Sequence, residues 1–330
     1  MPYSTVYDAR HQSQQLLSEL GRGGEGTVYG LQQRNDVIVK IYHSQILEKR
    51  GPLLQEKIAA MQGVEKLFND KNLSWPLINV FDQQQKWLGY AMYRASGKPM
   101  SRMAHAVLFQ KHFPNLDRRQ LVDYLLSMLK QIKILHKNAV MIGDYNLDNF
   151  ICDSTSNKVF FIDCDSYQIT VNGTVFPCPV GSPDMTPLEQ HGKDFSQVKR
   201  TLESEYFSIA ITLFKCLMLG RHPYDIVGGA DPVTNLKKGN FPYGTGNRGI
   251  PKGHWYNIWS HMPHRVKSVF IRTFTEGARD PAQRASVDEW QQVLRIYRQE
   301  MDKGWHEVAI RPQQPKPKEY RGKSVSVTQA

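Results

Sequence analysis

Five glycines fall within the eleven residues LGRGGEGTVYG, from Leu20 to Gly30. A glycine inside a regular strand or helix costs roughly 0.5–1 kcal/mol relative to alanine, so such a run needs a physical reason. The reason is either a tight turn or the close approach of another group to the backbone. Because strand-like apolar runs flank the glycines, the sequence predicts a hairpin here and not the start of a helix.

The glycines Gly21, Gly23 and Gly26, followed by Val28, match the pattern G-x-G-x-x-G-x-V. Alone this match is weak, because glycine-rich hairpins also occur without a function. In a functional hairpin of this kind the backbone N–H groups lie over phosphate groups. The next predicted strand, DVIVK, strengthens the interpretation, because pairing along the hairpin would place the ammonium group of Lys40 beneath the loop, near those phosphates.

A lysine in that position needs a carboxylate to hold it. We expect this carboxylate on the amphipathic helix that follows, with Glu56 as the first choice and Glu48 as the alternative. The helix is predicted between Pro52 and Asp70, because apolar residues recur there at three- and four-residue spacings. These residues are Leu54, Ile58, Met61, Val64, Leu67 and Phe68.

The organisation of the chain changes at about residue 95. Residues 13–95 alternate short apolar runs with turn signals, which is typical of a small antiparallel sheet, whereas residues 96–302 are mostly helical in pattern. The sequence therefore predicts an α+β fold with two lobes. Residues 1–12 are expected to form an N-terminal extension, and the Pro- and Lys-rich residues 303–330 a disordered tail or linker.

The second lobe contains two polar segments with a chemical pattern. In HKNAVMIGDYNLDNF, Asp144 precedes Asn149 by five residues, in a loop between a helix and a strand. There an aspartate can accept a hydrogen bond from a hydroxyl group while the asparagine coordinates a metal. After the turn STSN, Asp163 ends the apolar strand KVFFI and offers hard oxygen ligands to Mg²⁺.

Composition narrows the class of protein. The 330 residues are 40% hydrophobic and include four cysteines without metal-type spacing, which favours a globular protein in a reducing compartment. The formal charge of +11 suggests an anionic partner, although no base-reading motif is present. The N-terminus lacks the apolar core of a secretory signal, and the longest apolar stretch, 207–219, is too short to span a bilayer. We therefore expect a cytoplasmic protein without a membrane anchor.

The order of these motifs resembles that of eukaryotic-like protein kinase domains, from about Leu16 to Arg298. Three later segments agree with the resemblance: GSPDMTPLE resembles the end of an activation segment, ESEYFSIA the start of a large buried helix, and GRHPY the turn after it. In RDPAQRAS, Arg284 matches the arginine that pairs with the glutamate closing the activation segment, here Glu189. Such a bidentate pair would fix the loop to the lobe.

The resemblance implies a bilobal kinase-like fold, ATP as a cofactor, and Mg²⁺ with Mn²⁺ as an alternative metal. By position it implies that Lys40 binds the α- and β-phosphates, Asp144 orients the substrate hydroxyl, and Asn149 and Asp163 bind metal. The remaining implied nucleotide-binding residues are Val28 and Ile38 above the adenine, Ile151 below it, Met92 as gatekeeper, and a linker of Tyr93, Arg94 and Ala95 that offers backbone hydrogen bonds.

The chain departs from the family pattern at three places. Ile142 and Gly143 precede Asp144 where His and Arg are usual, so control by a phosphorylated activation loop is not expected. Asn146 replaces a lysine, which removes one positive charge from the developing transition state and predicts slow turnover. Asp165 replaces a glycine, and two roles stay open for it: a further metal ligand or a residue that stiffens the turn.

The expected function is transfer of the γ-phosphoryl group of ATP to serine or threonine hydroxyls of a protein substrate, including the protein itself. One alternative is a pseudokinase scaffold that binds nucleotide without transfer, and another is a small-molecule kinase. The motifs also look like those of bacterial kinases that, in some members, carry a C-terminal helix-hairpin-helix region. This resemblance implies association with DNA through a region absent from this chain.

Overall fold

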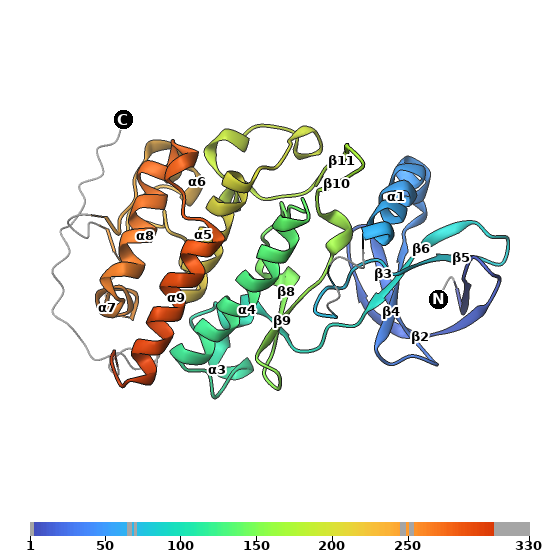
Figure 1. Ribbon diagram of the computed structural model, residues 1–330, viewed down its shortest axis with the longest axis horizontal. Helices are drawn as coiled ribbons and strands as arrows, with labels where there is room; N and C mark the ends of the chain where they lie inside the picture. Colours follow the sequence, from blue (N-terminus) through green and yellow to red (C-terminus); the bar gives the residue numbers. More distant parts are fainter. Residues whose placement is uncertain (1–2, 65–67, 69–70, 245–248, 251–253, 307–330) are drawn as a thin grey trace. The chain divides into compact units, whose positions relative to one another are not determined.

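The computed structural model describes residues 3–64, 68, 71–244, 249–250 and 254–306 (Figure 1). The chain divides into two compact units. The first unit comprises residues 1–96 and 160–176, and the second comprises residues 97–159 and 177–330. The predicted boundary near residue 95 thus lies next to an observed one, but residues 160–176 belong with the first unit. The predicted tail from residue 307 onward lies outside the described residues.

The first unit is built on six antiparallel strands, labelled in Figure 1. Their bounds are β1 Thr5–Tyr7, β2 Ser13–Arg22, β3 Gly26–Leu31, β4 Val37–Tyr42, β5 Ile78–Phe81 and β6 Trp87–Tyr93. They form a closed barrel in the order β1-β2-β3-β4-β6-β5. The strands are antiparallel as predicted, and the sheet closes into a barrel because β1, which lies within residues 1–12, pairs with both β2 and β5. Closing the barrel leaves neither edge of the sheet unpaired.

The strand register separates the barrel residues into two faces. Lys40 lies opposite Val28 of β3 and Tyr90 of β6, and Ile38 lies opposite Met92. Opposite residues of an antiparallel pair share a face, and residues two apart on one strand do so too, so these five side chains occupy one face. The other face forms the apolar core, which includes Tyr29, Leu31, Val37, Val39, Ile41, Val80 and Ala91.

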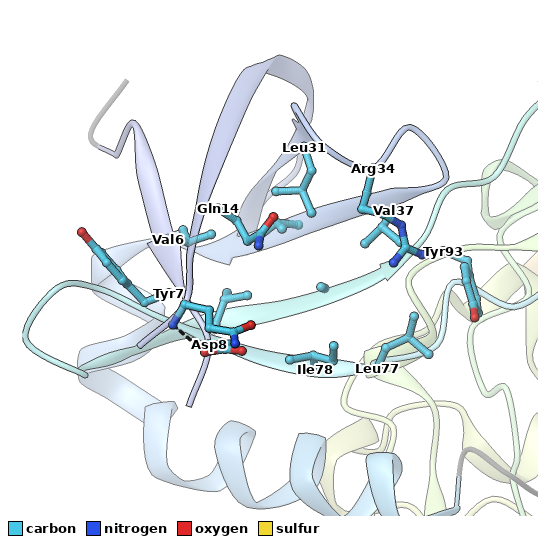
Figure 2. A pocket seen from close by; sticks show the side chains of 14 residues that line it. Val6, Tyr7, Asp8, Gln14, Leu31, Arg34, Val37, Leu77, Ile78 and Tyr93 are labelled. Atoms are coloured by element: carbon cyan, nitrogen blue, oxygen red, sulfur yellow. Dashed lines mark hydrogen bonds between the residues drawn. The ribbon is translucent and has the colours of Figure 1, made fainter. Parts of the chain in front are cut away.

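The core side of the barrel contains a pocket of about 440 Å³ (Figure 2). All six strands contribute to its lining, for example Val6 from β1, Gln14 from β2 and Leu31 from β3. Val37 and Val39 line it as well. Because side chains alternate along β4, this pocket and Lys40 lie on opposite faces of the sheet.

Helix α1, Ser44–Val64, follows β4 and starts earlier than predicted. Its backbone is non-helical at Arg50, where two helical segments meet at a kink. Pro52 lies at the start of the second segment, where a missing N–H group is tolerated. The prediction thus located the second segment alone. Of its apolar positions, Leu54, Ile58, Met61 and Phe68 are buried, Val64 is half-buried, and Leu67 lies outside the described residues.

The second unit is mostly helical, as predicted. Its α-helices among the described residues are α2 Met100–Met103, α3 Leu108–His112, α4 Arg118–Lys137, α5 Leu202–Leu217, α6 Pro232–Lys238, α7 His254–His261, α8 His264–Phe274 and α9 Val287–Asp302. Helix α5 begins with a capping box between Thr201 and Ser204. Its Phe214 packs edge-on against Phe270 and Phe274 of α8, so aromatic side chains form much of this core.

Short strands and turns carry the remaining segments. Strands β7 Lys98–Pro99, β8 Phe150–Asp153 and β9 Lys158–Phe161 form a three-stranded sheet. Strands β10 Ile169–Val171 and β11 Thr174–Phe176 form a hairpin. Between β9 and β10, residues 164–166 form a 3-10 turn that Asp163 precedes. Across the described parts of the chain, none of the helices has the length and apolar character that a bilayer crossing requires.

Candidate active site

Lys40 lies on the predicted face of β4 and forms ion pairs with two aspartates of the segment 160–176. Its Nζ is 3.5 Å from Asp163 Oδ1 and 2.8 Å from Asp165 Oδ2. The Lys40 side chain is 9% exposed and the Asp165 side chain 3%, whereas the Asp163 side chain is 52% exposed. The ammonium group therefore forms a buried ion pair with one aspartate and reaches a second aspartate whose carboxylate is open to solvent.

Asp165 is the residue that the sequence interpretation left undecided. It accepts two hydrogen bonds from Lys40 Nζ, at 3.0 and 2.8 Å, and one from the Tyr42 hydroxyl at 2.6 Å. Burial alone would raise the pKa of Asp165, but the charge of Lys40 and these hydrogen bonds outweigh it and hold the pKa below its usual value. For Lys40, burial acts to lower the pKa and is outweighed by the two aspartates, so its pKa is raised. Both groups are therefore charged at neutral pH.

This arrangement gives Lys40 a different partner from the predicted Glu56. Glu56 and the alternative Glu48 are both exposed on α1, and the carboxylates that bind Lys40 among the described residues are those of Asp163 and Asp165. The sequence carried one signal for this, since the second aspartate of Asp-Cys-Asp falls two residues after the predicted metal ligand. Whether an aspartate or a helix glutamate reaches the lysine depends on the path of the chain in three dimensions.

The glycine hairpin connects β2 and β3 as predicted, with Gly23 N–H donating to the Gly26 carbonyl at 2.9 Å. Gly26 is required by packing, because an added Cβ would lie 2.6 Å from the Ile41 carbonyl oxygen. At Gly21 and Gly24 an added Cβ would meet nothing within 4 Å, and neither residue has a positive φ. Neither local packing nor backbone conformation therefore requires these two glycines.

An ion pair links the tip of the hairpin to α1. Arg50, at the helix kink, contacts the carboxylate of Glu25, which lies between the glycines. The Glu25 charge also contributes to the raised pKa of Lys40, after burial and the effects of the two aspartates. The pair compensates a negative charge that would otherwise repel an anionic ligand near the loop.

The linker after β6 offers fewer backbone groups than the resemblance implies. The Tyr93 carbonyl accepts a hydrogen bond from the Ser74 hydroxyl at 2.9 Å, and Arg94 N–H donates to the Asp36 carbonyl at 2.9 Å. A carbonyl has a second lone pair, but an N–H group has one proton. Arg94 therefore has no free backbone donor for a base, and Ala95 carries the next N–H group along the chain.

In the second unit the structure brings Asp144 and Asn149 together. Asn149 Nδ2 donates to Asp144 Oδ2 at 3.4 Å, Asn149 is buried, and Asp144 is half-buried. Between them the Asn146 side chain accepts from Asp148 N–H and caps the turn Leu147–Asn149. Ile151 follows on β8, opposite Pro99. The five-residue spacing thus forms a compact loop in which carboxylate and amide lie side by side.

A buried glutamate that the sequence interpretation missed holds this loop. Glu205 of α5 accepts hydrogen bonds from Ile142 N–H at 2.8 Å, Gly143 N–H at 2.9 Å and the Tyr145 hydroxyl at 2.7 Å. Its side chain is 2% exposed. The signal in the sequence was the segment ESEYFSIA, in which the second of two glutamates lies directly before the mostly apolar part of the helix. Glu205 fixes the backbone immediately before Asp144.

Gly143 occupies a position that admits no side chain. Its φ is +73°, and an added Cβ would lie 2.6 Å from Cys178 Sγ and 3.4 Å from Arg200 Nε. Arg200 is buried, donates to the Val180 carbonyl at 3.0 Å and packs on the Phe195 ring. The loss of the usual arginine before Asp144 is therefore accompanied by another arginine packed beside the same backbone.

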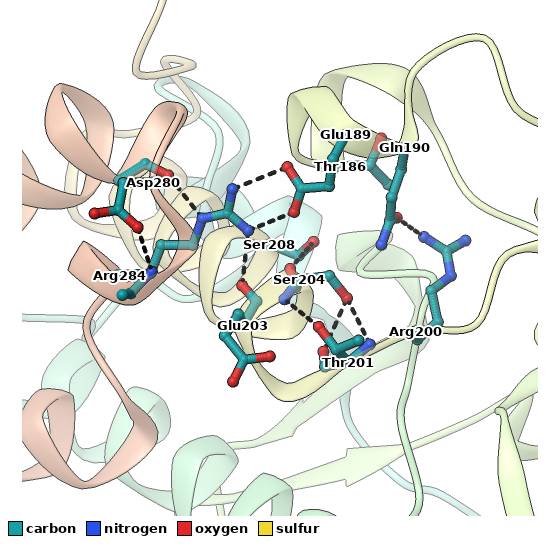
Figure 3. A network of polar contacts seen from close by, with 12 residues as sticks. Thr186, Glu189, Gln190, Arg200, Thr201, Glu203, Ser204, Ser208, Asp280 and Arg284 are labelled. Carbon is teal, nitrogen blue, oxygen red and sulfur yellow. Dashed lines mark hydrogen bonds and ion pairs between the residues drawn. The ribbon is translucent and has the colours of Figure 1, made fainter.

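The predicted pair between Arg284 and Glu189 is present and bidentate, at 2.6 and 2.9 Å (Figure 3). Arg284 also donates to the carbonyls of Glu203 and Gly277. The Arg284 side chain is fully buried, whereas the Glu189 side chain is 42% exposed. Planar two-bond pairing of this kind gives a fixed geometry to the segment that ends at Glu189.

The predicted metal ligands have the chemistry that Mg²⁺ requires. Asp163 presents an exposed carboxylate, and Asn149 presents an amide oxygen, since its nitrogen donates to Asp144. No cluster of three or more His, Cys, Asp or Glu side chains suited to a metal occurs among the described residues. Mg²⁺ is commonly bound by one or two protein oxygens together with substrate phosphates and water, so each of these side chains taken by itself offers a suitable oxygen. Asp163 belongs to the first unit and Asn149 to the second.

Comparison with known proteins points in the same direction. None of the protein-family models matches this chain. The chain is 29% identical over 309 residues to "Protein kinase YegI" of Escherichia coli O157:H7 and 29% identical over 308 residues to the protein of the same name in Escherichia coli strain K12. These alignments cover 91% and 90% of the chain but 47% of each relative, so the chain spans about half the length of the curated relatives it matches. The similarity supports a protein-kinase-like family for this chain.

Proposed function

We propose that this protein is an ATP- and Mg²⁺-dependent protein kinase that transfers the γ-phosphoryl group to serine or threonine hydroxyls. The observation that carries the proposal is the position of Lys40, opposite Val28 of the strand that follows the glycine hairpin and 3.5 Å from the exposed carboxylate of Asp163. A cation for phosphate oxygens and a ligand for the metal that accompanies them thus lie side by side. The similarity to relatives named protein kinases supports the same class of reaction.

The proposed site residues each have a defined part in the reaction. Lys40 binds the α- and β-phosphates, and the hairpin around Gly21 and Gly24 covers them with backbone N–H groups. Asp163 and Asn149 are the proposed ligands of Mg²⁺, which would neutralise charge on the phosphate oxygens. Asp144 accepts the hydrogen bond of the attacking hydroxyl and receives its proton. Positioning and charge stabilisation account for the rate, because no covalent intermediate with the protein is required.

A protein substrate is favoured over a small molecule by the segment that ends at Glu189. Its bidentate pair with the buried Arg284 and the hydrogen bond of Arg200 to Val180 hold this segment in a defined shape. A rigid, partly exposed segment is suited to docking an extended peptide, whereas a small-molecule kinase has no need of one. Association with DNA and cytoplasmic localisation stay predictions from the sequence.

The direct test is transfer of radiolabelled phosphate from ATP with Mg²⁺ to a generic basic protein. We expect acid-stable phosphoprotein with the wild type and none with Asp144→Ala, because the hydroxyl loses its proton acceptor. Asp153→Ala, at an exposed turn of the same unit, is the matched control and should retain transfer. Nucleotide binding without transfer by the wild type would establish the pseudokinase alternative, and transfer only to a small aminoalcohol would establish the other.

Mass spectrometry of the purified protein gives an independent test. Thr174, in the β10–β11 hairpin, is exposed, whereas Tyr167 and Thr186 are fully buried. Self-phosphorylation should therefore label Thr174 and leave the two buried hydroxyls unmodified. Label on Tyr167 or Thr186 would contradict this assignment.

A further inference from the structure

We infer that Asp165 is the carboxylate that positions Lys40 for phosphate binding, a role the sequence assigned to a glutamate on α1. This inference rests on the proposed function and deepens it, because it identifies what controls the geometry of the nucleotide lysine. The two aspartates of Asp-Cys-Asp then have separate roles: Asp163 faces solvent and binds metal, and Asp165 faces the lysine.

Contacts within the first unit carry the inference. Both carboxylate oxygens of Asp165 accept from Lys40 Nζ, at 3.0 and 2.8 Å, and the Tyr42 hydroxyl donates to Oδ2 at 2.6 Å. Lys40 and Tyr42 are two residues apart on β4 and share a face, so two side chains of the same strand donate hydrogen bonds to one carboxylate. A carboxylate restrained by two side chains has a fixed position, and it fixes the ammonium group in turn.

Burial explains why this pair matters more than a surface ion pair. The side chains of Lys40 and Asp165 are 9% and 3% exposed, so removing Lys40 leaves Asp165 as a buried charge without an ionic partner. Removing Asp165 leaves Lys40 with only the longer ion pair to the solvent-exposed Asp163. Glu56 is exposed, and an exposed glutamate on a long side chain would hold the lysine weakly. Phosphate binding by Lys40 therefore depends on Asp165.

One short turn of the chain carries both aspartates that contact Lys40. Asp163 directly precedes the 3-10 turn Cys164–Ser166 that contains Asp165, and its φ is +54°. A change in this short turn would move the metal ligand and the partner of the lysine together, whereas Glu56 takes part in neither ion pair of Lys40. The geometry points to the turn 163–166, and not to the helix glutamate, as the element that sets whether Lys40 is in place.

A double-mutant cycle tests the inference. Lys40→Met, Asp165→Asn and the double variant are compared for the KM of ATP, the KM of the protein substrate, kcat, and the affinity for a fluorescent ATP analogue. For Asp165→Asn we expect the KM of ATP to rise at least about tenfold with the KM of the protein substrate within about twofold of wild type. Because Asp165 acts through Lys40, the double variant should be no more impaired than Lys40→Met alone.

Melting temperature separates positioning from folding. If Asp165 were merely structural, Asp165→Asn would lower the melting temperature but leave nucleotide affinity unchanged, and its effect would add to that of Lys40→Met; either result overturns the inference. Tyr42→Phe removes one hydrogen bond and leaves the ion pair intact, so it should raise the KM of ATP less than Asp165→Asn does. It serves as a second variant if Asp165→Asn fails to fold.

Two further variants complete the test. Glu56→Gln should change the KM of ATP no more than Asp36→Asn, which removes an exposed carboxylate paired with Arg34 in the same unit. A tenfold rise for Glu56→Gln would return the role to the helix and overturn the inference. Failure of the proposed function has a different signature, since the wild type itself would then neither bind the ATP analogue nor transfer phosphate.

Discussion

Three glycines of this chain illustrate how one residue type meets different physical demands. At Gly26 the backbone of β4 comes too close for a side chain, and at Gly143 a positive φ combines with contact to Cys178. At Gly21 neither demand exists, since an added Cβ meets open space. The first two residues are therefore needed for folding, whereas packing does not require the third, for which the proposed function supplies a role.

Alanine substitutions at Gly26 and Gly21 should separate stability from function. Gly26→Ala should lower the free energy of unfolding by about 1–3 kcal/mol, because its Cβ would lie 2.6 Å from the Ile41 carbonyl oxygen. Gly21→Ala should change stability by less than about 0.5 kcal/mol. Under the proposed function it should still raise the KM of ATP, because a methyl group would occupy space next to the proposed phosphate position. Urea unfolding and steady-state kinetics measure the two effects, and a normal KM for Gly21→Ala would contradict the role of the hairpin.

Gly143→Ala should be among the most destabilising single changes in the second unit. Its Cβ would lie 2.6 Å from Cys178 Sγ at a φ of +73°, so strain and overlap add to a loss of about 2–4 kcal/mol. Gly239 is the matched control, because its φ of +71° is nearly the same and an added Cβ there meets nothing within 4 Å. Gly239→Ala should lose about 1 kcal/mol, the cost of the backbone alone. Equal losses for the two variants in urea unfolding would show that the Cys178 contact is not decisive.

At the scale of elements, helix α5 organises the second unit around buried polar contacts. The side chain of Glu205 holds the loop before Asp144, and the backbone carbonyl of Glu203 accepts from Arg284. One helix thus orients both the loop that carries the proposed proton acceptor and the arginine that anchors Glu189. The buried carboxylate of Glu205 is accommodated in this helix because it accepts hydrogen bonds from two backbone N–H groups and one hydroxyl group.

Glu205→Gln tests this organising role. The amide keeps the shape of the side chain but replaces one acceptor oxygen with a donor that faces backbone N–H groups. We expect a loss of about 1–3 kcal/mol in the free energy of unfolding and a lower kcat, because the loop that carries Asp144 loses its anchor. Glu203→Gln is the control, since this glutamate is exposed on the same helix and should behave as wild type. Unchanged kcat and stability for Glu205→Gln would refute the anchor.

At the scale of the whole molecule, the chain forms two compact units with separate cores. The barrel strands enclose an aliphatic cluster, and helices α5 and α8 share an aromatic one. Residues 160–176 return to the first unit after the chain has entered the second, so Lys40 and Asp165 belong to the same unit and form an ion pair although 125 residues separate them. The +11 formal charge belongs to the molecule as a whole and does not distinguish among anionic partners.

Stability should fall in acid through His222, in the turn after α5. Its Nε2 donates to the Asp184 carbonyl at 2.7 Å and its Nδ1 accepts from Tyr224 N–H, so the ring is neutral. Burial lowers the pKa of His222 to about 4, and the nearby charge of Lys215 acts in the same direction, against the opposing effect of Asp184. Between pH 6.5 and 4 the unfolded chain binds a proton that the folded protein does not. The free energy of unfolding therefore decreases as pH falls through this window.

Urea unfolding at pH 7.5 and pH 5 measures the effect. The contribution of His222 to the difference should be about 2 kcal/mol, with the lower stability at pH 5. His222→Gln cannot take up the proton and should show a correspondingly smaller pH dependence. The same pH dependence in both proteins would show that other groups are responsible.

Local sequence was sufficient for the elements and for residues linked by short spacing. The hairpin at Gly21–Gly26, the strand that carries Lys40 and the loop from Asp144 to Asn149 depend on neighbours within a few positions, so periodicity and turn chemistry predict them. The pair of Arg284 and Glu189 was predicted across 95 residues, because the order of several motifs supplied the register. These features can be predicted from periodicity, turn chemistry and motif order, which are visible in the sequence without the packed structure.

The tertiary structure alone decided which carboxylate meets which partner and how the sheet closes. Glu48, Glu56, Asp163 and Asp165 are chemically similar acids, and only the packed chain shows that Asp165 is buried against Lys40 while Glu56 faces solvent. Strand β1 has three residues, too few for a periodic signal, and it is stabilised by pairing with β2 and β5. Sequence determines local propensity, but burial and long-range pairing set the energy of a charge or a strand edge, and those exist only in the folded molecule.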